Sequence, residues 1–503
     1  MNHHRSAIFL DRDGTLIEDV GVLSNSCDIR LYPDTVDALR QLQKKYLLFV
    51  VTNQPGIANG QVSASQVEAV NKTMDELLVK EGVRITQWYV CPHARGDGCQ
   101  CIKPNPAFLL QASKDYQLDL NQSFMIGDHP HDVLTGDAAG AFGLYVLTGH
   151  GRQHFHELSP DRLAFHTIGD AAHWILQHPR AAQDMSHAVK IGAEAIRRGG
   201  LVAFPTETVY GLGADAFNPE AVARIFEVKR RPLHNPLIVH VSEQRQIQPL
   251  VTHISKTAKR LMERFWPGPL TLVLPKADIV PDIVTAGNPT VAVRMPANPW
   301  ARELIALSGC PIAAPSANAF GRTSPTTARH VEDQLHGWYD ILIDGGACRV
   351  GIESTVLSLV GDTPLLLRPG GVSQEEIVEI TKAIEIFHPQ NKAGKRFESP
   401  GMMSSHYAPA TQLLLVDDVE PYANRPDVGV ILFQNSAVCF QSPTYVLSPH
   451  GDLKEAAANL YQVMRKLDAM GLGLIVAQRA PNSGLGAAIN DRLKKAAVNH
   501  RHS

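Results

Sequence analysis

Polar side chains that suit metal and phosphate binding follow three short apolar runs in the first third of the chain. The runs are residues 7–10, 46–51 and 123–126. The polar residues that follow them are Asp11, Asp13, Thr52, Asn53, Asp128 and Asp132. Asp11 and Asp13 can face the same side of an extended chain, and two carboxylates in one site repel each other unless a cation is present. Because Mg²⁺ prefers oxygen ligands, the pattern predicts a magnesium site.

Short, almost wholly apolar runs are typical of strands that a parallel sheet buries on both faces. In an open α/β sheet, ligands bind beyond the carboxyl ends of the strands. We therefore expect the three runs to be strands whose ends bring the carboxylates, the Thr52 hydroxyl and the Asn53 amide together. A solvated turn is the alternative for the Asp-x-Asp-Gly-Thr motif at residues 11–15 taken alone.

A second group of residues suited to metal binding lies between residues 91 and 101. It consists of Cys91, His93, Cys99 and Cys101. Three thiolates and one imidazole make a complete tetrahedral set for structural Zn²⁺ and leave no open position for catalysis. The loop of residues 94–98 lacks apolar side chains that would hold it, which favours a metal. Reduced surface cysteines without a metal are the alternative.

Cationic and hydroxyl-bearing residues mark the second half of the chain. Residues 219–228 are predicted to form a helix with a proline in its first turn, and Lys229 and Arg231 follow it. Thr290 and Arg294 share one face of a predicted strand. A buried arginine needs an anion, so this face fits recognition of an amino-acid carboxylate. For Lys229 and Arg231, a favourable interaction with the helix dipole is the structural alternative.

Gly211, Gly213 and Ala216 match the spacing of a dinucleotide-binding fingerprint. That fingerprint needs a strand, a turn and a helix that follow each other directly. Here Pro205 and a polar turn follow the preceding strand, and Pro219 places the next helix too late. The sequence also contains no GxxxxGK[ST] motif. We therefore expect neither a nicotinamide or flavin site nor a P-loop.

Composition sets the class of protein. The chain has 503 residues, of which 44% are hydrophobic and 19% charged, as in a soluble globular protein of about three domains. Its net charge of −3 provides no strong field to attract nucleic acid or an anionic membrane. No apolar run is long enough to span a bilayer, and the first residues lack the features of a signal peptide. Seven cysteines favour a reducing compartment, so we expect a cytoplasmic protein.

Apolar runs alternate with helical stretches, which predicts an α/β fold. We expect one domain over residues 1–181, a second over residues 182–390, a linker or lid over residues 391–410, and a small α/β domain over residues 411–503. The expected strands of the small domain are residues 413–416, 428–433 and 472–477, with a helix over 453–470.

Residues 5–178 resemble the haloacid dehalogenase (HAD) phosphatases. The motifs that carry this resemblance are Asp11-x-Asp13-Gly-Thr, Thr52-Asn53, Lys103-Pro-x-Pro and Gly-Asp128-x-x-x-Asp132. The chain is similar to the branch that contains heptose bisphosphate phosphatase and histidinol phosphatase, which also carries a zinc loop. The resemblance implies a Rossmann-like fold in which Asp11 attacks phosphorus to form an aspartyl-phosphate. Asp13 is then expected to be the general acid and afterwards the general base.

The same resemblance assigns the other site residues of this domain. The residues expected to bind the phosphoryl group are Thr52, Asn53 and Lys103. Those expected to hold Mg²⁺ are Asp11, Asp128 and the backbone carbonyl of Asp13. Two positions depart from the branch, because Ile102 stands where an arginine is common and His129 stands where a lysine is frequent. We therefore expect a phosphate ester as substrate without carrying over heptose bisphosphate specificity.

Residues from about 186 to the end resemble the long form of the threonylcarbamoyl-AMP synthase family. The motifs Lys229-x-Arg231 and Ser316-x-Asn318 carry the resemblance, and residues 485–493 are similar to the family's ending. It implies a YrdC-like α/β domain followed, from about residue 411, by a Rossmann-like domain. The implied reaction joins L-threonine, bicarbonate and ATP into threonylcarbamoyl-adenylate and releases pyrophosphate, mainly by positioning and charge neutralisation. A separate transferase complex uses that product to modify tRNA.

This resemblance also implies site residues. The expected ATP-binding residues are Lys229, Arg231, Asn235, Ser316, Asn318, Ser324 and Arg368. The expected threonine-binding residues are Thr206, Thr208, His240, Thr290, Arg294 and Ser354. Residues 399–409 resemble a linker that closes over the pocket, in which His406 and Tyr407 match the family. At residues 403–405 the chain has Met-Ser-Ser, where the family often has a basic and an aromatic residue.

We therefore expect a bifunctional enzyme, a zinc-stapled HAD phosphatase fused to a threonylcarbamoyl-AMP synthase, with Mg²⁺ as cofactor and no membrane partner. The alternative is an RNA-binding YrdC-like module joined to a non-catalytic HAD scaffold. The near-neutral net charge and the lack of a basic stretch interleaved with aromatic residues count against this alternative.

Overall fold

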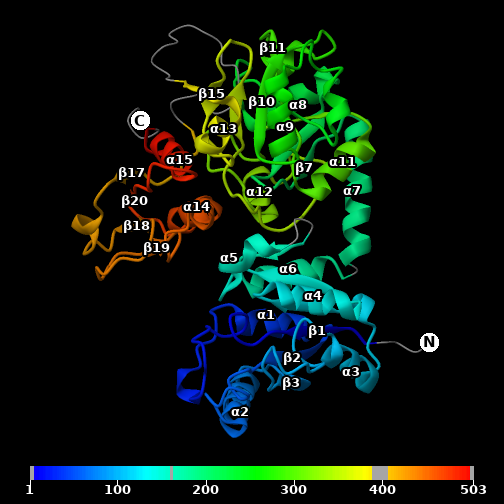
Figure 1. The fold of residues 1–503 in the computed structure, drawn as a ribbon, viewed down its shortest axis with the longest axis vertical. Coiled ribbons are helices and arrows are strands. Elements are labelled where there is room, and N and C mark those ends of the chain that lie inside the picture. The colour runs from blue at the N-terminus through cyan, green and yellow to red at the C-terminus, as the bar shows by residue number, and fades with distance from the viewer. Residues whose placement is uncertain (1–4, 159–161, 180, 388–405, 499–503) are drawn as a thin grey trace. The chain divides into compact units, whose positions relative to one another are not determined.

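The computed structural model describes residues 5–158, 162–179, 181–387 and 406–498. The chain forms two compact units, residues 1–186 and 187–503, and both are α/β (Figure 1). The boundary between the units lies within helix α7 (Ala181–Arg197), close to the position where the sequence predicts a change of domain. None of the helices in the described parts of the chain has the length and apolar character of a membrane span.

Unit 1 is built on a six-stranded parallel sheet in the order β3-β2-β1-β4-β5-β6. Its strands are β1 (Ala7–Leu10), β2 (Leu47–Asn53), β3 (Gln87–Cys91), β4 (Phe124–Gly127), β5 (Phe142–Val146) and β6 (Ala164–Phe165). The three predicted runs are β1, β2 and β4, and the expectation that they are buried parallel strands is confirmed. The chain order reverses between β1 and β4, which is the switch point where such sheets bind ligands.

The helices of unit 1 begin at local sequence signals. They are α1 (Thr35–Leu42), α2 (Ala64–Lys80), α3 (Ala107–Tyr116), α4 (Pro130–Ala139), α5 (Gly151–His154) and α6 (Ile168–Gln177). Ser63 and Gln66 form a capping box at α2, and His129 and Asp132 form one at α4. The second box matters for the site, because it fixes the helix that follows β4 and carries Asp132.

The larger sheet of unit 2 has ten strands in the order β13-β7-β8-β12-β9-β11-β10-β14-β15-β16, and it mixes parallel and antiparallel neighbours. Its first strands are β7 (Val202–Phe204), β8 (Gly211–Asp215), β9 (Ile238–His240), β10 (Leu270–Pro275) and β11 (Thr290–Arg294). The others are β12 (Ile312–Ala314), β13 (Ile341–Leu342), β14 (Thr355–Ser358), β15 (Leu365–Arg368) and β16 (Glu385–Ile386). Leu270, Leu272 and Leu274 contribute to a large apolar core on one face of this sheet.

Helices pack around this sheet. They are α7, α8 (Pro219–Lys229), α9 (Lys256–Phe265), α10 (Asp282–Thr285), α11 (Pro299–Ser308), α12 (Ala328–Leu335) and α13 (Gln374–Thr381). The helix predicted over residues 219–228 is therefore confirmed as α8, and the Asn218 side chain caps it. The Gly211-x-Gly213 segment forms β8 rather than a phosphate-binding turn. A Cβ atom on Gly213 would lie 2.6 Å from the Ile312 side chain, so this glycine allows close packing within the sheet.

The last part of unit 2 has a four-stranded parallel sheet in the order β17-β20-β18-β19. Its elements are β17 (Leu413–Val416), β18 (Val428–Leu432), β19 (Thr444–Val446), α14 (Leu453–Asp468), β20 (Leu474–Gln478) and α15 (Gly486–Val498). The three predicted strands and the helix between them are confirmed, whereas β19 was not predicted because it is only three residues long. Most of the expected linker, including residues 403–405, lies outside the described residues.

Candidate active sites

A cavity of about 840 Å³ opens at the carboxyl ends of β1, β2 and β4 in unit 1. The predicted residues that line it are Asp11, Asp13, Thr52, Asn53, Lys103 and Asp128. The structure thus brings together the six residues that are expected to act in the phosphatase site, and Asp132 of the same motifs lines the cavity as well. Asn53 also accepts a hydrogen bond from the backbone N–H of Lys103 at 3.2 Å, which ties the lysine loop to the end of β2.

Lys103 lies between two buried carboxylates. Its ammonium group is 2.5 Å from Asp11 Oδ1 and 2.5 Å from Asp132 Oδ1. Burial raises the pKa of Asp11 to about 7 despite Lys103, and Asp132 and Asp13 add to the rise. Burial raises the pKa of Asp128 to about 9, together with repulsion from Asp11 and Asp132. The protein by itself therefore leaves this site short of positive charge.

The donor set fits a hard divalent cation. Carboxylate oxygens of Asp11, Asp128 and Asp132 lie within 4.8 Å of one another. A cation there would relieve the repulsion that raises the pKa of Asp11 and Asp128, and carboxylate oxygen is the ligand type that Mg²⁺ prefers. Asp132 was not among the expected Mg²⁺ ligands, and its bond to Lys103 gives it a role in holding the lysine.

Asp13 is held by three neighbours, and the sequence interpretation did not include two of them, Gln54 and Arg12. The Gln54 amide donates to Asp13 Oδ2 at 2.8 Å, and the Thr52 hydroxyl is 3.4 Å from the same oxygen. The buried Arg12 guanidinium donates to both Asp13 carboxylate oxygens at 3.0 Å. Gly14 keeps space for the Asp128 carboxylate, because a Cβ atom there would lie 2.0 Å from Asp128 Oδ2 and its φ is +78°.

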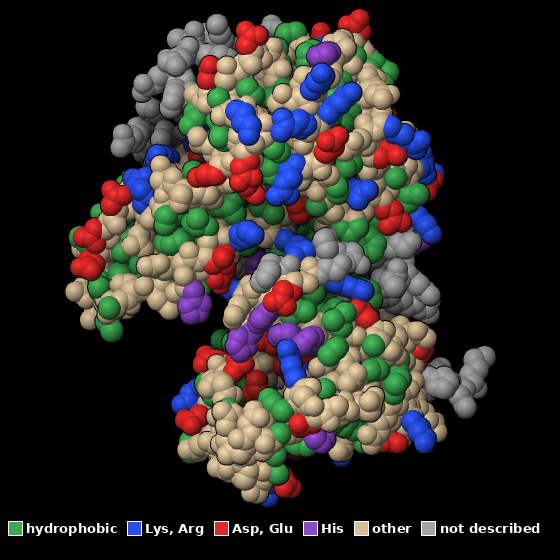
Figure 2. All heavy atoms as spheres, viewed as in Figure 1, with side chains coloured by type: hydrophobic (Ala, Val, Ile, Leu, Met, Phe, Trp, Pro, Cys, Tyr) green, Lys and Arg blue, Asp and Glu red, His purple; other side chains and the backbone are tan. Residues whose placement is uncertain are grey.

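Three histidines line this cavity. His129, His131 and His150 line it together with Ile102, and the Arg95 guanidinium lies 3.2 Å from His131 Nδ1. Figure 2 shows histidine side chains gathered on this face of unit 1. Burial, with nearby His131, lowers the pKa of His129 to about 4. His129, which departs from the lysine expected from the resemblance, is therefore a neutral imidazole at pH 7.

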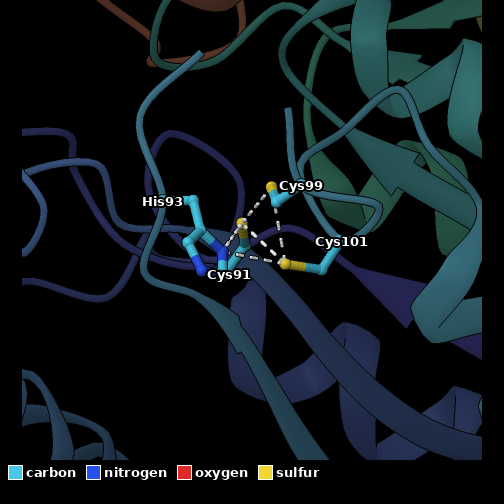
Figure 3. A group of neighbouring side chains, drawn as sticks. All are labelled: Cys91, His93, Cys99 and Cys101. Carbon is cyan, nitrogen blue, oxygen red and sulfur yellow. Dashed lines mark hydrogen bonds between the residues drawn. The ribbon is translucent and has the colours of Figure 1, made fainter. Parts of the chain in front are cut away.

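The four predicted zinc ligands form one cluster (Figure 3). Cys101 Sγ lies 3.1 Å from Cys91 Sγ and 3.7 Å from Cys99 Sγ, and it lies 3.3 Å from His93 Nδ1. Zn–S bonds of about 2.3 Å separate the sulfurs of a tetrahedral site by about 3.8 Å. The cluster therefore has nearly the size of a zinc site, and its ligand chemistry fits that metal.

Unit 2 contains a cavity that encloses about 540 Å³ of empty space, part of which is open to solvent. The predicted residues that line it are Thr206, Thr208, Arg231, His240, Arg294, Ser316, Ser354, Arg368, His406 and Tyr407. The first and last of these residues, Thr206 and Tyr407, are more than 200 positions apart in the sequence, and the fold brings them to one cavity. His240 Nδ1, His406 Nδ1 and the Tyr407 hydroxyl are buried and have no hydrogen-bond partner among the described residues.

Four predicted residues lie behind the lining and support it. Lys229 donates hydrogen bonds to the backbone carbonyls of Ser316 and Asn318. Asn235 accepts two hydrogen bonds from Arg231, and Ser324 donates to Glu353. Burial, together with nearby Arg231, holds the pKa of Lys229 well below its usual range. An anionic ligand would therefore be the favoured neighbour of this lysine.

The buried arginine of β11 has a partner within the chain, which corrects the sequence argument. Arg294 NH2 lies 2.6 Å from Glu207 Oε1, so burial alone does not require a substrate carboxylate as its anion. Thr290, four residues earlier on β11, does not line the cavity. The Thr206 hydroxyl donates to the Val209 backbone carbonyl at 2.6 Å, which gives Thr206 a role in the local turn.

Three family profiles match the chain. The profile described as telomere recombination (Sua5/YciO/YrdC) matches residues 194–370, and that of the threonylcarbamoyl-AMP synthase C-terminal domain matches residues 372–498. A HAD-hydrolase-like profile matches residues 100–171.

Known proteins are similar to each half of the chain. A threonylcarbamoyl-AMP synthase of Pyrococcus abyssi is 45% identical over 324 residues, which cover 61% of this chain and 93% of the relative. A D-glycero-β-D-manno-heptose-1,7-bisphosphate 7-phosphatase of Pasteurella multocida is 43% identical over 142 residues, or 27% of this chain and 77% of the relative. The crystal structure of P. abyssi Sua5 complexed with L-threonine has 43% identity and a TM-score of 0.58, covering 61% of this chain and 94% of that chain.

Proposed function

We propose two active sites for this chain, which belongs to the threonylcarbamoyl-AMP synthase family and carries a HAD-type phosphatase domain before its synthase part. It is an enzyme of two classes, a transferase and a hydrolase. The transferase cavity of unit 2 makes threonylcarbamoyl-adenylate from L-threonine, bicarbonate and ATP. The product serves a separate complex that modifies tRNA. The observation that carries this proposal is the convergence of ten motif residues on one cavity.

The transferase reaction needs positioning and positive charge more than covalent catalysis. The amine of threonine captures CO₂ derived from bicarbonate as a carbamate. A carbamate oxygen then attacks the α-phosphorus of ATP, and pyrophosphate leaves. Arg231 and Arg368 line the cavity, with Lys229 directly behind Ser316, and these cations are assigned to the ATP phosphates.

Threonine is assigned to the part of the cavity near Thr208, His240, Arg294 and Ser354. Burial and nearby Arg294 lower the pKa of His240 to about 3, so this imidazole is neutral and offers one donor and one acceptor. Its Nδ1 atom has no partner among the described residues, as expected for a group that binds a ligand. His406 and Tyr407, which follow the expected linker in the sequence, line the same cavity.

Pyrophosphate release with ATP and bicarbonate, with and without L-threonine, tests this function. Release should depend on threonine, and Lys229→Ala should nearly abolish it. Lys256→Ala, which changes an exposed lysine at the start of α9, is the matched control and should not affect release. Equal release without threonine, or full replacement of threonine by serine, would contradict the assignment.

The cavity of unit 1 is proposed to hydrolyse a phosphate monoester. Asp11 attacks phosphorus and forms an aspartyl-phosphate, while Asp13 protonates the leaving oxygen and then activates the water that releases phosphate. Lys103 is within bonding distance of Asp11 and is placed to neutralise the transferred phosphoryl group. Mg²⁺, held by Asp11, Asp128 and the backbone carbonyl of Asp13, would screen the anionic nucleophile from the anionic substrate.

Hydrolysis of p-nitrophenyl phosphate tests the phosphatase. Asp11→Asn should abolish hydrolysis and leave threonine-dependent pyrophosphate release unchanged. The matched control, Asp28→Asn, changes an aspartate of the 3₁₀ helix η1 (Ser26–Asp28) outside the cavity and should retain both activities. Unchanged hydrolysis in Asp11→Asn would show that unit 1 does not use this nucleophile.

A further inference from the structure

The C-terminal part of unit 2 contributes buried side chains to the wall of the transferase cavity. Glu353 lies in that wall, and Arg492 Nε donates to its Oε2 atom at 2.6 Å. The Tyr461 hydroxyl is 3.1 Å from both oxygens of the same carboxylate. Tyr461 belongs to α14 and Arg492 to α15, and both side chains are completely buried. A single carboxylate of the cavity is therefore held by two helices of the C-terminal domain, which is the part of unit 2 from Leu413 to Val498.

Glu353 connects these helices to residues assigned to the substrates. The Ser324 hydroxyl donates to Glu353 Oε1 at 2.5 Å. Arg368 donates to the backbone carbonyl of Ser354, the next residue, at 2.9 and 3.1 Å. Although burial alone would raise it, the pKa of Glu353 is lowered to about 2 because Arg492 and Arg368 stabilise the carboxylate. A carboxylate held in its charged form by two arginines is a poor proton acceptor, which indicates a positioning role.

Arg492 has a second contact at the cavity. Its guanidinium carbon lies 5.0 Å from the centroid of the Tyr407 ring, within cation–π distance. Tyr407 lines the cavity and has a φ of +68°, a backbone conformation that non-glycine residues rarely adopt. The Arg492 side chain thus contacts two residues that line the cavity, Glu353 and Tyr407.

The backbone near Glu353 packs closely against helix α14 of the C-terminal domain. A Cβ atom on Gly351, two residues before Glu353, would lie 2.4 Å from the backbone of Ala458 in α14. Arg465 of the same helix donates to the backbone carbonyl of Thr323 at 2.6 Å, next to Ser324. The backbone on both sides of the Glu353 contacts is therefore packed directly against α14.

We propose that Tyr461 and Arg492 are positioning residues for the transferase reaction, which act through Glu353 and Tyr407. They hold the Ser324 hydroxyl and the Ser354–Arg368 wall in the arrangement that binds ATP and threonine. The C-terminal domain is therefore part of the active site and not only a neighbour of it. This inference rests on the transferase function proposed above.

Steady-state pyrophosphate release by the full chain tests this role. Tyr461→Phe removes one hydroxyl and keeps the ring, so kcat/KM for ATP should fall at least fivefold while the melting temperature stays within about 2 °C. Arg492→Met and Glu353→Gln should each cause a larger loss. Because Arg492 acts mainly through Glu353, the double variant Arg492→Met with Glu353→Gln should be about as slow as the slower of these two single variants. Hydrolysis of p-nitrophenyl phosphate by unit 1 should stay constant throughout.

Arg479→Met is the matched control. It removes an arginine of the same domain that bonds the exposed Asp417 at 2.6 Å, and it should not alter kcat or KM. Wild-type kinetics in Tyr461→Phe would overturn the proposal, whether or not Arg492→Met folds. Independent, additive losses in the double variant would also overturn it. A wild-type chain without threonine-dependent release would instead refute the proposed function itself.

Discussion

Replacing Arg294 by methionine tests whether this cation both stabilises the fold through Glu207 and binds the substrate. Arg294 and Glu207 form an ion pair at 2.6 Å, with side chains that are 4% and 8% exposed. Methionine fills much of the same volume without the charge, and Glu207 then retains the backbone N–H of Ala297, at 3.0 Å, as a donor. Breaking a buried pair in this way costs about 3–5 kcal/mol, because the remaining charge is uncompensated.

Urea unfolding followed by tryptophan fluorescence measures this cost. With a slope of about 3 kcal/mol per M, the midpoint for unit 2 should fall by about 1 M or more. A second variant, Arg294→Met combined with Glu207→Gln, removes both charges and should recover most of the lost stability. It should not recover pyrophosphate release, because the proposed threonine carboxylate would still lack its cation.

The two readouts separate a structural role of Arg294 from a binding role. Recovery of both stability and pyrophosphate release in the double variant would refute the assignment of Arg294 to threonine. An unchanged midpoint in Arg294→Met would refute the account of the ion pair. Hydrolysis of p-nitrophenyl phosphate, measured in the same samples, reports on unit 1 and should not change in either variant.

Three further predictions concern other sites. Because the pKa of Glu353 is about 2 in the folded chain against an ordinary 4.5, its contribution to stability is present above pH 4.5 and is lost as the pH falls toward 2. The free energy of unfolding should fall by up to about 3 kcal/mol over this range. The urea midpoint of the wild type should therefore fall more than that of Glu353→Gln, which lacks the titrating carboxylate. Elemental analysis should find one zinc per chain, which Cys101→Ser loses and Cys310→Ser, outside the cluster, retains. Gly14→Ala should abolish phosphatase activity and spare pyrophosphate release, because its Cβ atom would collide with Asp128; full hydrolysis would contradict this.

Much of the phosphatase site was predictable because its residues sit at strand ends. Buried parallel strands are short apolar runs that the sequence displays directly, and their carboxyl ends meet at one edge of the sheet. The pattern of apolar runs and polar residues is therefore enough to place Asp11, Asp128 and Thr52 together. The cluster of Cys91, His93, Cys99 and Cys101 was predictable for a similar reason, since its members lie within eleven residues of one another.

The supporting residues of both sites were not predictable from such patterns. Gln54 and Arg12 neighbour motif residues in the sequence, yet nothing in their spacing shows that both bond Asp13. Glu207 lies between Thr206 and Thr208, and its bond to Arg294 depends on how β11 lies beside that loop. Ion pairs between distant residues depend on distances within the folded chain, which sequence spacing does not determine.

The amino-acid sequence by itself determined the two kinds of chemistry, because side-chain type and local spacing decide which groups can bind phosphate, metal or a nucleotide. The tertiary structure decided which charges neutralise one another. Arg294 is paired with Glu207, and Glu353 is held by Tyr461 and Arg492 from more than 100 residues away. A buried charge is stable only beside its partner, and only the packing of helices and sheets brings such partners within 3 Å.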